Sequence, residues 1–150
     1  GDPIEIYVER DEVVLKKYSP LFNADGLADG VAQCLASRTG HTALVCDRDA
    51  FLSGSGAGVR EIISKSVSKA IAGLMTGEKT AVVNQSDGSA PIELTDGETY
   101  GFCNELFIPI KTKNDVIGGI LLADKGKDQP VSSLDISLTA LSADFLASHF

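Results

Sequence analysis

Residues 105–123 read ELFIPIK, TKND and VIGGILLA, which are two apolar runs joined by a short polar segment. The polar segment Thr112–Asp115 predicts a turn, so that Glu105–Lys111 and Val116–Ala123 pair as an antiparallel hairpin. Neither run alternates between apolar and polar residues except at its ends. A strand with two apolar faces is covered on both sides. The sequence therefore predicts an α/β (α+β) fold, with an antiparallel-rich sheet between two helical layers.

Two helices are predicted near the ends of the chain. Ser132 and Asp135 have the spacing of a capping box, so a C-terminal helix is expected to begin there. Asp25 is the predicted N-cap of an earlier helix, and Gly40 is its predicted stop. Each helix carries apolar residues at helical spacing, which predict its buried face. They are Leu27, Val31, Cys34 and Leu35 in the first helix, and Leu134, Leu138, Leu141 and Phe145 in the second.

The middle of the chain is expected to supply more strands and the other helical layer. Strands are predicted at residues 42–46, 50–53, 80–84 and 91–94, the last within a polar, turn-rich loop over residues 85–101. Apolar residues recur at helical spacing from Val59 to Leu74. Ser64 and Ser66 are the predicted breaks in this helix, because serine competes for backbone hydrogen bonds.

The composition excludes several classes of protein. With 150 residues, 43% of them hydrophobic, the chain is expected to form a sizeable core. Its net charge of −8 repels the phosphate backbone of DNA and anionic membrane surfaces. The longest apolar run is too short to span a bilayer and no signal peptide opens the chain, so a cytoplasmic protein is predicted. Cys34, Cys46 and Cys103 lie in apolar segments and are expected to be buried, reduced thiols.

No catalytic centre, metal site or cofactor is predicted. The two histidines are His41, after the first helix, and the penultimate residue His149. Neither position suggests the base of a catalytic triad, and His41 suits the negative end of the helix dipole. No His, Cys and Asp residues have zinc-site spacing. The glycine-rich segment Gly54–Gly58 has neither the third glycine of the dinucleotide fingerprint nor a Walker lysine.

The first twenty residues differ from the rest. Ile4–Glu9 and Val13–Tyr18 are predicted strands around a turn at Arg10–Glu12. A two-stranded hairpin cannot bury its own apolar face. Since the chain also begins without an initiator methionine, it is expected to be part of a longer protein.

Several segments resemble a known family. The sequence GDPIEIYVERDEVVLKKYSP, residues 1–20, resembles the end of the swapped-hairpin DNA-binding domain of AbrB-type transcription regulators. HTALVCDRD, residues 41–49, resembles the start of the C-terminal domain of the sporulation regulators in that family. LFIPI at 106–110 and VIGGILL at 116–122 resemble the paired strands of a GAF domain. The resemblance implies that residues 21–150 are the GAF-like regulatory domain of a sporulation transcription factor, which would act in the forespore.

The resemblance also implies partners. In that family the basic DNA-contacting loop lies in the first half of the AbrB-like domain, which this chain lacks. DNA binding is therefore expected through the missing N-terminal domain, with no DNA-contacting residue here. In GAF proteins the two terminal helices often form a four-helix bundle with a second subunit, so a homodimer or higher homo-oligomer is expected. Packing of these helices within one subunit is the alternative.

A small-molecule effector site is predicted near one end of the sheet. Tyr100 and Phe102 precede Glu105, and aromatic groups with a carboxylate suit a ligand pocket. In a GAF fold, the loop after Ser53 borders that pocket. The expected effector-binding residues are Phe51, Ser53, Ser55, Tyr100 and Glu105.

Two other functions stay open from the sequence. A purely architectural dimerisation module would need no pocket. A cysteine-dependent methionine sulfoxide reductase of the GAF type would need an accessible thiolate at Cys46 or Cys103. A low thiol pKa needs nearby positive charge, and the basic residue that the sequence places close to one of these thiols is Arg48, two residues after Cys46.

Overall fold

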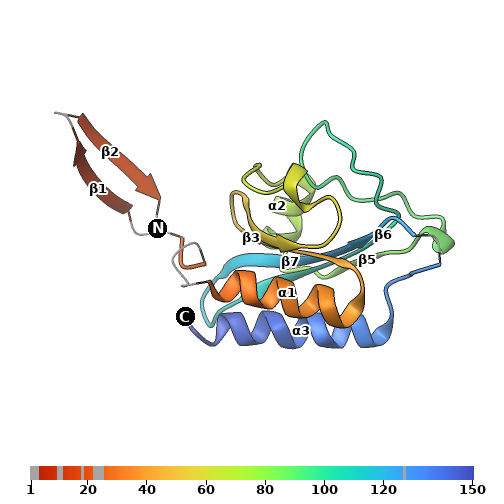
Figure 1. Cartoon of the computed structure of the whole chain (residues 1–150). Helices are drawn as coiled ribbons and strands as arrows, with labels where there is room; N and C mark the ends of the chain where they lie inside the picture. The colour runs from red at the N-terminus through yellow and green to blue at the C-terminus, as the bar shows by residue number, and fades with distance from the viewer. Residues whose placement is uncertain (1–3, 10–11, 18, 22–25, 127) are drawn as a thin grey trace.

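The computed structural model describes residues 4–9, 12–17, 19–21, 26–126 and 128–150. An N-terminal hairpin of β1 (Ile4–Glu9) and β2 (Glu12–Lys17) stands apart from an α/β body (Figure 1). The predicted hairpin is confirmed, although Glu12 belongs to the second strand rather than to the turn. Tyr18 and the predicted N-cap Asp25 lie outside the described residues.

The body is built on a five-stranded antiparallel sheet. Its strand order is β4-β3-β7-β6-β5, so the predicted hairpin, β6 paired with β7, lies inside the sheet. β3 pairs with the other side of β7. The strands are β3 (Thr42–Asp47), β4 (Phe51–Ser55), β5 (Ala81–Val83), β6 (Asn104–Lys111) and β7 (Val116–Asp124).

The two helical layers are present as predicted. α1 (Leu27–Thr39) and α3 (Ser133–Ala147) lie together on one face of the sheet, and α2 (Lys69–Thr76) lies on the other (Figure 1). Short 3-10 turns occupy Val59–Glu61 (η1) and Gln85–Asp87 (η2). The long apolar stripe of the middle segment is interrupted near Ser64, whose φ is 72°, and helix resumes where Ser68 caps α2.

The strand predicted at residues 91–94 is absent. Pro91 has no N–H to donate. The Ile92 N–H is taken by the Glu105 side chain, and the Leu94 carbonyl accepts from the Ser68 N–H. These backbone groups thus bond to a side chain and to the start of a helix, and not to a neighbouring strand. The segment therefore crosses the sheet face as a loop.

The faces that the terminal helices bury differ from the prediction. α1 buries Ala28, Ala32 and Leu35, whereas Val31 is half-buried and Cys34 is exposed. α3 buries Asp135, Thr139, Ala143 and Leu146. Of its predicted stripe, Leu134, Leu141 and Phe145 are 65%, 67% and 48% exposed, whereas Leu138 is half-buried and packs against the core. Small residues let a helix approach the sheet closely, so the larger side chains are left on the outer face. Of the three thiols expected to be buried, Cys46 is buried and Cys103 is half-buried.

His41 joins three elements at the start of α3. Its Nε2 lies 2.9 Å from an Asp135 carboxylate oxygen, and its Nδ1 lies 3.0 Å from an Asp124 carboxylate oxygen at the end of β7. Asp135 and Ser132 also form the predicted capping box. Through its two nitrogens the ring therefore links the end of β7 with the first turn of α3.

Candidate effector-binding site

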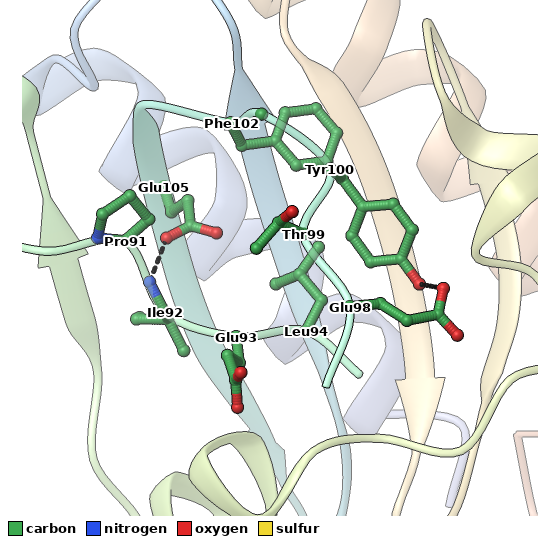
Figure 2. A pocket seen from close by; sticks show the side chains of 10 residues that line it. Pro91, Ile92, Glu93, Leu94, Glu98, Thr99, Tyr100, Phe102 and Glu105 are labelled. Carbon is green, nitrogen blue, oxygen red and sulfur yellow. Dashed lines mark hydrogen bonds between the residues drawn. The ribbon is translucent and has the colours of Figure 1, made fainter. Parts of the chain in front are cut away.

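A small pocket lies between β6 and the loop of residues 91–102. Its volume is about 140 Å³ (Figure 2). The loop reaches this place because Ser68, at the start of α2, donates its N–H and hydroxyl to the Leu94 and Glu93 carbonyls. The lining residues are Pro91, Ile92, Glu93, Leu94, Glu98, Thr99, Tyr100, Gly101, Phe102 and Glu105.

Glu105 is the buried charged group of this pocket. It is only 1% exposed, and one of its carboxylate oxygens accepts the Ile92 N–H at 2.5 Å. Burial raises the pKa of Glu105 to about 7, and the hydrogen bond from Ile92 offsets part of that rise. At neutral pH the group is therefore poised between its neutral and ionised forms.

A polar network fastens the loop at the mouth of the pocket. The Tyr100 hydroxyl donates to Glu98 at 3.0 Å and lies 2.6 Å from the Thr95 hydroxyl. Lys65 forms an ion pair with the same Glu98 carboxylate and lies 5.6 Å from the centre of the Tyr100 ring. This ion pair raises the pKa of Lys65 and lowers that of Glu98. The contacts tie the loop to the segment that precedes α2.

The structure brings two of the five predicted effector-binding residues to this pocket, Tyr100 and Glu105. Phe51 is fully buried in the core on the same face of the sheet. A register shift in β4 pairs Ser53 with Val45 and Ser55 with Ala43. Val45 and Ala43 belong to the core under α1 and α3, so both serines face away from the pocket. The sequence did not predict residues 91–94 as part of the pocket lining, because a Pro-Ile-Glu-Leu run resembles an ordinary strand.

Glu105→Gln is expected to stabilise the protein at pH 8 and to change little at pH 5. Because the folded-state pKa is raised, the folded protein binds more protons than the unfolded chain between about pH 4.5 and pH 7. The stability that the neutral carboxyl contributes is complete below pH 4.5 and is lost as the pH rises toward 7. The loss is about 2 kcal/mol between pH 5 and pH 8.

Urea unfolding of wild type and variant at the two pH values measures this difference. Glu93→Gln, an exposed change on the same loop, serves as the control and should leave the pH profile unchanged. Equal pH dependence in wild type and Glu105→Gln would show that Glu105 does not titrate in this way.

The three cysteines are free thiols in different surroundings. Burial, and secondarily the neighbouring Asp47, raises the pKa of Cys46 to about 12, which is opposite to what a nucleophilic thiolate needs. Cys34 is exposed on α1, and Cys103 lies near the Gly101 and Lys125 carbonyls. Among the described residues, no His, Cys, Asp and Glu side chains are grouped to hold a metal ion, and none of the described helices could cross a membrane.

A second concave surface lies on the outer side of the terminal helices. We call it the helix-pair groove; its volume is about 530 Å³. Apolar side chains supply most of its surface, and the exposed Leu141 and Phe145 form one side. It is lined by Gly26, Leu27, Gly30, Val31, Cys34, Leu141, Ser142 and Phe145.

Comparisons with known proteins agree with this architecture. Residues 24–150 match the family model described as stage V sporulation protein T C-terminal, transcription factor. The chain is 33% identical over 148 residues to stage V sporulation protein T of Bacillus subtilis (strain 168), covering 98% of this chain and 80% of that protein.

Among solved structures, the chain resembles the GAF domain of an Acinetobacter phosphoenolpyruvate-protein phosphotransferase. The TM-score is 0.66 at 14% identity, over 89% of this chain and 82% of the other. It also resembles the type II free methionine-R-sulfoxide reductase of Thermoplasma acidophilum, with a TM-score of 0.64 at 12% identity over 85% and 91% of the two chains. At such identities the likeness concerns the fold, and the predicted GAF-like architecture is confirmed.

Proposed function

Because the chain belongs to the stage V sporulation protein T C-terminal family of transcription factors, we propose that its α/β body is the sensing and oligomerising part of such a factor. The observation that carries the sensing role is a pocket with a buried carboxylate under a tethered loop. The role is regulatory and not catalytic. The raised pKa of the Cys46 thiol supports this choice over a reductase, whose chemistry needs a thiolate.

A short path connects the pocket with the helical layer on the other face. Glu105 follows Asn104 on β6, and Asn104 pairs in register with Asp124 of β7. Asp124 contacts His41, which also contacts Asp135 at the start of α3. A ligand that moves the end of β6 would thus act on the position of α3, provided that it binds one arrangement better than the other.

We propose the helix-pair groove as the interface with a second copy of the chain. Large apolar side chains such as Leu141 and Phe145 are costly to leave in water, and an apolar patch of this kind marks an interaction site. A two-fold arrangement would place α1 and α3 of one subunit against α1 and α3 of the other. The family resemblance to oligomeric transcription factors supports this choice of partner.

We further propose that residues 1–20 connect this body to a DNA-binding domain and form its last hairpin. The chain has a net charge of −8, so the contacts with DNA phosphates would come from outside it. The boundary between residues 20 and 21 remains a prediction. The arrangement of the two bodies in a dimer would then depend on the ligand, and it would set the distance between the DNA-binding domains of the two subunits.

The sensing role is tested by a thermal-shift screen of small metabolites against wild type and Thr99→Trp. Thr99 is an exposed residue of the lining, so the indole would fill the pocket without disturbing the core. A ligand at 100 times its dissociation constant adds about 2.7 kcal/mol, which raises the melting temperature by several degrees. We expect such hits with wild type and their loss in the variant.

The control is Thr80→Trp, which places the same side chain at an exposed position outside the pocket. Hits that survive in Thr99→Trp would locate the ligand elsewhere. A broad screen without hits in wild type would favour the architectural function, in which the body serves as a dimerisation module.

A further inference from the structure

The charged side chains that line the Glu105 pocket are all acidic. Glu93, Glu98 and Glu105 contribute carboxylates, and no lysine, arginine or histidine is among the lining residues. Two lysines lie just outside. Lys65 is paired with Glu98, and Lys125 lies 5.7 Å from the centre of the Phe102 ring. Neither forms an ion pair with Glu105 in the part of the chain that the structure describes, so no described side chain balances the charge of the ionised Glu105 at the base of the pocket.

Glu105 also has an unused hydrogen-bonding oxygen. One oxygen accepts the Ile92 N–H, and no described residue donates to the other. Figure 2 shows this second oxygen turned away from Ile92, toward the interior of the pocket. This oxygen is not among the fully buried atoms without a partner, so it reaches the surface of the pocket, where a ligand can donate a hydrogen bond to it. An ammonium group has three N–H donors and no acceptor.

The size and walls of the pocket limit the rest of the ligand. A cavity of about 150 Å³ holds a benzene molecule, so about 140 Å³ fits roughly six non-hydrogen atoms. Ile92, Leu94, Tyr100 and Phe102 supply apolar and aromatic walls. Such walls suit a short hydrocarbon body, and aromatic ring faces attract a neighbouring cation.

We propose that this pocket binds a small primary alkylammonium ion, with the ammonium group donating to Glu105 and the alkyl group packed between Ile92, Leu94 and Phe102. The inference rests on the proposed sensing function and names the class of its ligand. The cation completes the hydrogen bonding of the carboxylate and neutralises it. Its alkyl group contacts the loop of residues 91–102, so binding stabilises that loop against the sheet.

The proposal predicts a particular pH dependence. The cation binds the ionised carboxylate, and burial raises the pKa of Glu105 to about 7 in the free protein. Affinity should therefore rise with pH through neutrality and level off above about pH 8. The ligand itself stays charged in this range, because an alkylammonium has a pKa near that of lysine, about 10.4.

The experiment compares three probes of equal size by titration calorimetry and amide chemical shifts. They are n-pentylammonium, the neutral 1-pentanol and the anionic butanoate. We expect n-pentylammonium to bind at least tenfold more tightly than either of the others. Its affinity should be about tenfold higher at pH 8 than at pH 6, as the ionised fraction of a group with this pKa requires. The amide shifts should centre on Ile92 and Glu105.

Two variants locate the effect. Glu105→Gln keeps the acceptor for the Ile92 N–H but lacks the charge, so the tenfold preference and the pH dependence should both disappear. Glu93→Gln removes an exposed carboxylate of the same lining and should change the affinity less than threefold. The pH profile of the wild type tests the proposal even where the Glu105→Gln protein is difficult to obtain.

Three results would overturn the proposal. Tighter binding of 1-pentanol or butanoate, or affinity that falls as the pH rises, would show that the pocket binds a neutral or anionic ligand while Glu105 is protonated. The proposed sensing role would then still stand. Shifts centred on the helix-pair groove would place the cation elsewhere. Absence of binding by all three probes would reject the ligand class, and the metabolite screen with Thr99→Trp would still decide on sensing itself.

Discussion

Replacing His41 with alanine is expected to lower the free energy of unfolding by about 3–5 kcal/mol, because it leaves two largely buried carboxylates without the imidazole ring that contacts both of them. His41 is 5% exposed and lies within 3.0 Å of both Asp124 and Asp135. Without the imidazole, the end of β7 and the first turn of α3 carry like charges that face each other. Thermal and urea unfolding measure the loss, which corresponds to a decrease of roughly 10 °C in melting temperature.

His149→Ala is the matched control. His149 is exposed at the end of the chain, where its ring contacts the Phe145 carbonyl, so its removal should change stability by less than about 0.5 kcal/mol. A double-mutant cycle with Asp124→Asn separates charge from packing. If the loss comes from the contact between the ring and the carboxylate, the His41→Ala change should cost less in the Asp124→Asn background. Additive losses would show that the effect is a cavity and not an uncompensated charge.

Leu141→Glu is expected to dissociate the proposed dimer, with the dissociation constant rising at least a hundredfold. Leu141 is 67% exposed and lines the helix-pair groove. A two-fold interface contains each substituted position twice, so the two carboxylates would both be buried without a partner. A loss of about 1.4 kcal/mol for each copy already gives a hundredfold change. The monomer should remain folded, because this side chain contributes nothing to the core.

Sedimentation equilibrium over a range of protein concentrations measures the dissociation constant. Val82→Glu provides the control, since Val82 is an exposed apolar residue on the edge strand β5 and lies outside the groove. It should leave the association unchanged. A wild-type chain that sediments as a monomer at all concentrations, or a Leu141→Glu chain that associates as tightly as wild type, would exclude the groove as the interface.

Much of the fold could be predicted because its strongest signals are local. The β6–β7 hairpin follows from two apolar runs and a polar turn, and the capping box of α3 follows from Ser132 and Asp135. The glycines of the VIGG segment were predicted only as part of a family pattern. The structure gives their reason, because a Cβ at Gly118 would lie 2.1 Å from the Cys46 carbonyl oxygen, and one at Gly119 would lie 2.2 Å from the Phe107 ring.

The remaining features depend on long-range packing, which spacing along the chain does not encode. The stripe containing Leu141 has the periodicity of a buried face, yet the sheet selects the face with Thr139 and Ala143. One extra residue in β4 turns Ser53 to the opposite side of the sheet. Glu105 and Tyr100 were found because aromatic and acidic residues cluster near one strand end. That only one oxygen of Glu105 is bonded depends on the position of the Ile92 N–H, which the sequence does not give.

The strand order also has a consequence for how the chain is synthesised. β3 pairs with β7, and α1 packs beside α3, although about seventy to a hundred residues separate each pair along the sequence. A ribosome releases the N-terminal partner first, so α1 and β3 leave the exit tunnel before the segments that cover them have been translated. The sheet of this body can therefore close only after Val116–Asp124 has emerged, and α3, which is translated later still, completes the layer that α1 began.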